Sequence, residues 1–364
     1  IAKRFQEFLE NSPQTSAIKL LTNILKYGTE EMNFNSDEYI FELTDGIIGD
    51  NYPVPDKMLI HIEKIVHNYL MKELCQNKEF ESNFEVFAVE GGTAAMCYIF
   101  DSLVVNNLLK SGDTIALMTP IFTPYLEIPH LPNYKFNVIN IKANEVDENG
   151  NPTWQYTKEE LNKLKNKNIK VLFVVNPNNP ASVALSRDCK DNLISVVKEH
   201  NPELMIVTDD VYCTFVDNFH SLVSELPYNT LGVYSYSKYF GVTGWRLGTI
   251  FLNEKNIFND LIKKLSPDMK NELNERYKHL CQNPTEISFM DRLVADSRQV
   301  ALNHTAGLST PQQVQMAFFS LFALIDKENT YKQLTKDICK SRKNLLFNGL
   351  ELEYEKSRHD AAYY

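Results

Sequence analysis

One stretch decides the expected fold: VLFVVNPNNP, at residues 171–180. Its first five residues are apolar without interruption, which predicts a strand in a sheet that helices cover on both faces. The prolines and amides that follow predict a rigid turn directly after that strand. Open α/β sheets bind their ligands at this carboxyl edge. The amides are therefore candidate ligand contacts, although a turn of this kind needs no function to explain it.

Outward from this stretch, short apolar runs alternate with amphipathic helical patterns. The other expected strands are at residues 84–89, 114–118, 205–208, 232–236 and 247–251. Helices are expected at 93–109 and at 186–200, the second with Ser186 as its N-cap. This alternation predicts an α/β fold with three α/β/α layers and a mainly parallel central sheet.

A smaller domain is expected beside this core. Residues 1–50 would be its N-terminal segment and residues 51–310 the large domain, with a charged helical insertion at about 256–300. A long helical pattern follows Pro311 and runs toward Leu346, and residues 311–364 would form the interdomain helix and the start of a C-terminal small domain. Because no closing strands follow, we expect that domain to be incomplete and the chain to be a piece of a longer protein.

Composition excludes several classes of protein. The 364 residues include 47 acidic and 37 basic ones, for a net charge of −10. An acidic excess argues against nucleic-acid binding, which needs basic residues to neutralise phosphates, and against attachment to an anionic membrane. No apolar stretch reaches the ~18–20 residues that cross a bilayer. The six cysteines form no CxxC pair, so we expect reduced, mostly buried thiols in a cytoplasmic protein.

The most informative motif is YSYSKYFGVTGWRLG, at residues 234–248, where a strand is expected to end near Lys238. A lone lysine at a strand end is usually a solvated surface residue. Ser235 and Lys238 also match the SxxK of serine acyl-enzymes, but that class needs SDN and KTG elements, and neither occurs in the sequence. The other functional interpretation is a lysine that forms a Schiff base with an aldehyde cofactor, with Ser235, Ser237 and Arg246 around an anionic group.

Two further segments support a cofactor site. EGGTAA, at residues 90–95, joins an expected strand to a helix, so bare amides could bind a phosphate there; it matches neither GxGxxG nor a nucleotide P-loop. TDDVY, at residues 208–212, places a carboxylate at a strand end. A carboxylate ~4 Å from a pyridinium, at an effective dielectric of ~20, stabilises it by about 4 kcal/mol, or roughly 3 pKa units. Alternatively, Asp209 only caps the next helix, and the glycines only make a tight turn.

With these four motifs in this order, the chain resembles the fold-type I pyridoxal 5′-phosphate enzymes, the aspartate aminotransferase superfamily, over essentially its whole length. Segments at residues 46–53 (GIIGDNYP), 89–103 and 303–316 resemble the branch that decarboxylates L-aspartate at C4. The resemblance implies an enzyme that converts L-aspartate to L-alanine and CO2 and also transaminates aspartate. An ordinary aminotransferase for aspartate or another amino acid is the nearest alternative. A cofactor-binding regulator and a structural α/β protein are more distant ones.

The resemblance also implies roles for single residues around the cofactor ring. Lys238 would carry the cofactor and later move a proton, and Asp209 would pair with the pyridine nitrogen. Asn179 and Tyr212 would bind the ring hydroxyl oxygen. Phe122, in TPIF at residues 119–122, would stack on the ring.

The phosphate end would be held by a second group of residues. These are Gly92, Thr93, Ser235, Ser237 and Arg246. Each charge-assisted hydrogen bond to a phosphate contributes about 1.5–3 kcal/mol. In GLSTP, at residues 307–311, Ser309 or Thr310 would reach the phosphate of a second subunit, which implies a homodimer at least.

Two departures from the family pattern bear on these expectations. The usual Pro-Thr-Gly after the turn asparagine is Pro180-Ala181-Ser182 in this chain. The arginine that grips the substrate α-carboxylate has no matching segment, and neither Arg342 nor Arg358 sits in a suitable context. A protein of these residues alone is expected to bind cofactor poorly or turn over slowly.

Overall fold

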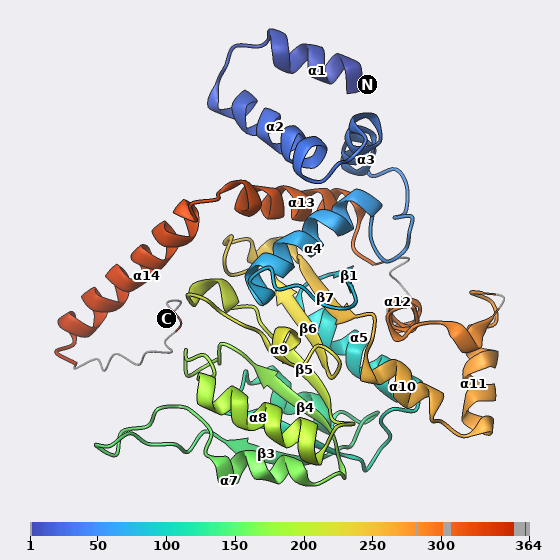
Figure 1. Cartoon of the computed structure of the whole chain (residues 1–364), viewed down its shortest axis with the longest axis vertical. Coiled ribbons are helices and arrows are strands. Elements are labelled where there is room, and N and C mark those ends of the chain that lie inside the picture. Colours follow the sequence, from blue (N-terminus) through green and yellow to red (C-terminus); the bar gives the residue numbers. More distant parts are fainter. Residues whose placement is uncertain (1, 282, 301–306, 353–360, 362–364) are drawn as a thin grey trace.

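The computed structural model describes residues 2–281, 283–300, 307–352 and 361 (Figure 1). Its centre is a seven-stranded sheet in the order β1-β7-β6-β5-β4-β2-β3. The strands are β1 Phe84–Val89, β2 Thr114–Thr119, β3 Asn137–Lys142, β4 Ile169–Val175, β5 Met205–Asp209, β6 Thr230–Ser235 and β7 Gly248–Asn253. β7 is antiparallel to both of its neighbours, β1 and β6, and the other pairings among these strands are parallel. The prediction of a mainly parallel sheet is confirmed.

Helices cover both faces of the sheet, as the apolar strands require. The longer ones are α1 Ala2–Asn11, α2 Ser16–Lys26, α3 Ser36–Ile48, α4 Ile60–Cys75, α5 Gly92–Val105, α8 Arg187–His200, α11 Pro267–Tyr277, α12 Phe289–Val300, α13 Thr310–Ile325 and α14 Thr330–Gly349. The shorter ones are α6 Pro124–Glu127, α7 Lys158–Asn162, α9 Leu222–Glu225 and α10 Ile257–Lys263. Along β4, Phe173 and Val175 pack toward α5 and α12, whereas Leu172 and Val174 pack toward α7 and α8. α4 and α13 cover the rest of that second face.

Most predicted elements are present, but no individual helix was predicted in residues 1–75, where the structure has α1 to α4. β3 was not predicted; it is an edge strand in which Ile141 is the buried residue and the others are exposed or half-buried. The helix expected at 93–109 ends earlier, at Val105. The prediction of one long helix after Pro311 is wrong, because this segment forms two helices, α13 and α14. At the break between them, the Asp326 carboxylate accepts hydrogen bonds from the backbone N–H groups of Thr330 and Tyr331, and Asn329 is left-handed at φ 54°.

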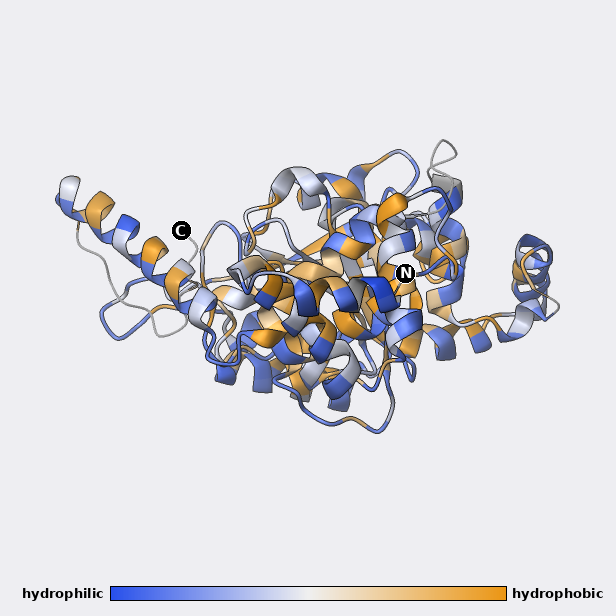
Figure 2. Cartoon of the chain, turned by 90° about the horizontal axis from the view of Figure 1, so that it is seen from above, coloured by the Kyte–Doolittle hydropathy of each residue, from blue (hydrophilic) through white to orange (hydrophobic). Residues whose placement is uncertain are grey.

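The first and last described helices lie outside the sheet layers. α2 and α3 pack against α13, and α14 extends away from the sheet (Figure 1). Ion pairs from Lys332 to Glu73 and from Lys336 to Asp217 connect α14 to the rest of the molecule. Hydrophobic residues recur along α14 (Figure 2), and Leu345 is one that lies exposed. The division into domains stays a prediction. Among the described residues, none of the helices combines the length and apolarity of a membrane span.

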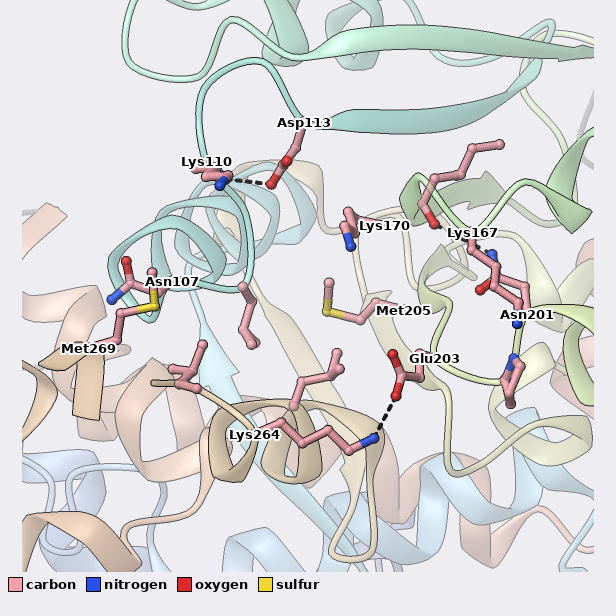
Figure 3. Close-up of a pocket in the computed structure, with 15 residues that line it drawn as sticks. Asn107, Lys110, Asp113, Lys167, Lys170, Asn201, Glu203, Met205, Lys264 and Met269 are labelled. Carbon is pink, nitrogen blue, oxygen red and sulfur yellow. Dashed lines mark hydrogen bonds and ion pairs between the residues drawn. The ribbon is translucent and has the colours of Figure 1, made fainter. Parts of the chain in front are cut away.

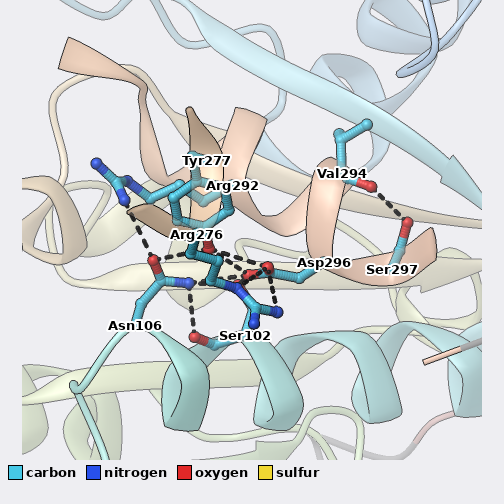
Figure 4. Close-up of polar contacts among 8 residues, drawn as sticks. All are labelled: Ser102, Asn106, Arg276, Tyr277, Arg292, Val294, Asp296 and Ser297. Carbon is cyan, nitrogen blue, oxygen red and sulfur yellow. Dashed lines mark hydrogen bonds and ion pairs between the residues drawn. The ribbon is translucent and has the colours of Figure 1, made fainter. Parts of the chain in front are cut away.

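The predicted helical insertion is present as α10 to α12, and a buried polar network joins it to α5 (Figure 4). The Asp296 carboxylate, fully buried, accepts hydrogen bonds from Ser102 Oγ at 2.7 Å, Asn106 Nδ2 at 2.9 Å and Arg276 Nη2 at 3.0 Å. The Asp296 network comprises Ser102, Asn106, Arg276, Tyr277, Arg292 and Asp296. It ties the insertion to the helix that begins at Gly92.

A cavity of about 690 Å³ opens at the amino ends of β2, β4 and β5 (Figure 3). Lys110, Lys167, Lys170 and Lys264 line it, and Lys264 pairs with Glu203 at 2.5 Å. None of the residues predicted to bind the cofactor lines this amino-edge cavity. This cavity lies at the edge of the sheet opposite the strand ends that carry the predicted cofactor-binding residues. It is therefore separate from the candidate site.

Candidate active site

The candidate site lies where β4, β5 and β6 end and α5 begins. A cavity of about 170 Å³ opens at this edge. All ten residues predicted for the site line it. They are Gly92, Thr93, Phe122, Asn179, Asp209, Tyr212, Ser235, Ser237, Lys238 and Arg246. The lining also includes Tyr125, Val175, Val211 and Thr243, which the sequence analysis did not name.

One end of the cavity is built to hold an anion. α5 starts at Gly92, and its N-cap residue, Gly91, has no side chain that could cap the first N–H groups. Such a helix start attracts negative charge. Ser235 Oγ lies 3.0 Å from Ser237 Oγ, and both serines are buried. Arg246 is left-handed at φ 56°, and its Nη1 donates to the Thr243 carbonyl at 3.0 Å. The guanidinium thereby reaches back over the start of α5.

Two glycines make that close approach of backbone and guanidinium feasible. Gly91 has φ +94°, and a Cβ there would lie 2.6 Å from Arg246 Nη2. A Cβ on Gly248, the first residue of β7, would lie 2.6 Å from the Cα atom of Gly91. Gly91 needs glycine because of its positive φ. Gly248 needs glycine because the Gly91 backbone cannot move aside as a flexible side chain can.

At the other end, the two neighbouring aspartates have different environments. Asp209 lines the cavity, and its Oδ1 accepts only the Val211 N–H, at 3.2 Å, among the backbone donors of the described residues. Asp210 is fully buried away from the cavity and accepts from Thr208 Oγ1 at 2.9 Å and Ser221 Oγ at 2.5 Å. Burial raises the pKa of Asp210 to about 7. Asp209 therefore faces the cavity as a possible ligand rather than capping a helix.

Aromatic and amide side chains form the wall between these ends. Asn179 Nδ2 donates to the Tyr212 hydroxyl at 3.3 Å. Asn178 Nδ2 donates to the Pro120 carbonyl at 2.6 Å, which ties the turn after β4 to the loop that carries Phe122. Lys238 lies half-buried beside this wall, directly after β6.

Tyr125 is the main residue that sequence reasoning missed. Its hydroxyl donates to Asp209 Oδ2 at 2.6 Å, and its ring meets Phe122 edge to face at 5.2 Å. The available signal was a second aromatic residue one helical turn after Phe122. Ser309 and Thr310 do not line this cavity; Thr310 borders another one, and their predicted role toward a second subunit stays a prediction. Arg358 lies outside the described residues.

Comparison with known proteins identifies the family. Residues 68–349 match the model of the aminotransferase class I and II family. The chain belongs to this family.

Individual relatives agree with that assignment. The chain is 45% identical over its full 364 residues to the bifunctional aspartate aminotransferase and L-aspartate beta-decarboxylase of a Pseudomonas species, and it covers 68% of that protein. Among solved structures, an aspartate aminotransferase mutant of Thermus thermophilus superposes with a TM-score of 0.60 at 17% identity, covering 85% of this chain and 72% of that one. Cystalysin from Treponema denticola, whose structure contains pyridoxal 5′-phosphate, has a TM-score of 0.56 at 15% identity, with coverages of 88% and 71%. The two structures share the fold.

Proposed function

We propose that the chain is the cofactor-binding part of a pyridoxal 5′-phosphate-dependent L-aspartate 4-decarboxylase, which converts L-aspartate to L-alanine and CO2 and also transaminates aspartate. The observation that carries the proposal is that ten predicted residues line one cavity in a chain 45% identical to the Pseudomonas bifunctional enzyme. When bound, pyridoxal phosphate supplies an electron sink for bond cleavage at the amino acid.

The donor set at the anion end fits the phosphate of this cofactor. Free N–H groups at Gly92 and Thr93, the hydroxyls of Ser235 and Ser237, and the Arg246 guanidinium are all donors that a phosphate dianion accepts. Arg246 adds the formal positive charge. These residues would hold the phosphate and so set the depth of the cofactor in the cavity.

The other end fits a pyridine ring that carries an aldehyde. The buried Asp209 carboxylate would keep the ring nitrogen protonated, and the hydroxyl of Tyr212 with the amide of Asn179 would bind the ring oxygen. Phe122 would cover one face of the ring and keep water from it. The Lys238 amine would hold the aldehyde, leave it when aspartate arrives, and then move the proton from Cα. The β-carboxylate of aspartate is lost as CO2, and alanine is released.

The remaining sequence expectations are part of this proposal. We propose a cytoplasmic homodimer at least, with Ser309 or Thr310 reaching the phosphate of the second subunit. The proposed large domain spans residues 51–310, flanked by small-domain segments at 1–50 and 311–364.

The test uses the full-length protein loaded with pyridoxal phosphate and given L-aspartate without an oxo-acid acceptor. Alanine and CO2 are expected in equal amounts over many turnovers. A single half-turnover that releases oxaloacetate, and resumes only when 2-oxoglutarate is added, would instead identify an ordinary aminotransferase.

Replacing Gly248 with alanine is expected to weaken cofactor binding and to lower the free energy of unfolding by roughly 1–3 kcal/mol, the usual cost of overpacking. The new Cβ would lie 2.6 Å from Gly91 Cα and 2.7 Å from its carbonyl carbon, so the turn before α5 must shift. Fluorescence titration with pyridoxal phosphate and urea unfolding measure the two effects. Gly244→Ala is the matched control, since a Cβ there meets nothing within 4 Å; equal behaviour of the two variants would contradict the prediction.

A further inference from the structure

Tyr125 is the residue in the candidate site that has no assigned task. It lies in α6, is only 2% exposed, and comes from a part of the chain 84 residues away from Asp209. The 2.6 Å distance between its hydroxyl and Asp209 Oδ2 is short for a hydrogen bond between oxygens and is typical of one to an ionised acceptor. Burial and the neighbouring Asp209 raise the pKa of Tyr125, so its phenol stays a proton donor.

The other groups around Asp209 cannot replace this contact. The Val211 N–H donates to Oδ1, at the longer distance of 3.2 Å. The Lys238 amine attracts the carboxylate, but its proposed task requires it to move. The neighbouring carboxyl group, Asp210, is held by Thr208 and Ser221 and does not contact Tyr125 among the described hydrogen bonds. Tyr125 is therefore the side chain that holds Oδ2, among the described residues.

We propose that Tyr125 is a positioning residue: its hydroxyl holds Asp209 ionised and oriented so that the carboxylate can pair with the cofactor ring nitrogen. This inference rests on the proposed function only in so far as the cofactor is pyridoxal phosphate, and it does not depend on which amino acid is the substrate. A carboxylate has about four acceptor positions. One is taken by Tyr125 and one by Val211, which leaves acceptor capacity for a further donor in the cavity.

The direction of the effect follows from what each group does to Asp209. Burial raises the pKa of Asp209, and the hydrogen bond from Tyr125 is the largest influence that lowers it. Removing the hydroxyl would raise this pKa further, so Asp209 would be protonated over more of the acidic range. A hydrogen bond to a charged acceptor corresponds to a shift of roughly one to two pH units.

The test is Tyr125→Phe, which keeps the ring and its contact with Phe122 but removes the hydroxyl. The dissociation constant of pyridoxal phosphate is measured from pH 5 to 9 in the full-length protein, together with kcat and KM for aspartate. As the pH is lowered, cofactor affinity is expected to begin falling at a pH about one to two units higher in Tyr125→Phe than in the wild type. The kcat for aspartate is expected to fall with little change in KM. Tyr134→Phe, a buried tyrosine of the same core, is the matched control.

A double-substitution experiment separates positioning from packing. If Tyr125 acts through Asp209, Tyr125→Phe has no further effect on cofactor affinity in an Asp209→Asn background. An equal loss of affinity in both backgrounds, or an unshifted pH profile, would overturn the inference. A wild-type protein that binds pyridoxal phosphate but does not act on aspartate would refute the proposed function and leave this inference standing.

Discussion

Replacing Lys238 with alanine is expected to stop turnover of aspartate, with kcat lower by roughly 10²–10⁴ from the lost proton transfer alone. The lysine follows β6 directly and lies half-buried at the cavity, next to the buried pair Ser235 and Ser237. Its amine would both hold the cofactor aldehyde and move the proton, so alanine leaves neither task filled. Steady-state kinetics of alanine release measure the loss.

Two controls separate a lost amine from a damaged fold. Lys264→Ala changes an exposed lysine at the amino-edge cavity and is expected to retain full activity. A small primary amine added to Lys238→Ala is expected to restore part of the rate, because it supplies the missing base. Turnover of Lys238→Ala at the wild-type rate would exclude the proposed role of the lysine.

Replacing Asp296 with alanine is expected to lower the free energy of unfolding by about 3–5 kcal/mol, the cost of removing one partner of a buried ion pair. The fully buried carboxylate is the acceptor shared by Ser102, Asn106 and Arg276 (Figure 4). Alanine removes the acceptor of the buried Ser102 hydroxyl and leaves the Arg276 charge without its partner. Urea unfolding of the full-length protein measures the change.

The control for Asp296 comes from the same helical insertion. Asp260 pairs with Lys263 on an exposed face of α10, where an ion pair contributes about 0–1 kcal/mol. Asp260→Ala should therefore unfold close to the wild type. Comparable losses in the two variants would mean that the Asp296 network does not hold the insertion to α5.

The candidate site was accessible from sequence because its residues follow strand ends. An apolar run that stops at polar residues is visible locally, and parallel strands bring their carboxyl ends to one edge. Asn179, Asp209 and Lys238 meet for that reason. Tyr125 was missed because its partner Asp209 is 84 residues away, and an aromatic residue one helical turn after Phe122 does not by itself indicate that contact.

The strands were predicted where burial was nearly complete and missed where it was not. β4, buried along nearly its whole length, was found within one residue, whereas the edge strand β3 lacks a continuous apolar run. The break between α13 and α14 was missed because Asp326 and Asn329 are compatible with a helical pattern. The hydrogen bonds that the Asp326 carboxylate accepts at the start of α14 form only once the chain has turned.

Because β7 runs against its neighbours, it starts at the same edge of the sheet where β6 ends. The connection at residues 236–247 therefore stays at that edge, and it carries both Lys238 and Arg246. One short, continuous stretch of the sequence thus carries both the proposed covalent anchor and the proposed phosphate contact. A substitution elsewhere in the chain can therefore change the residues around the amino acid and leave this connection unchanged.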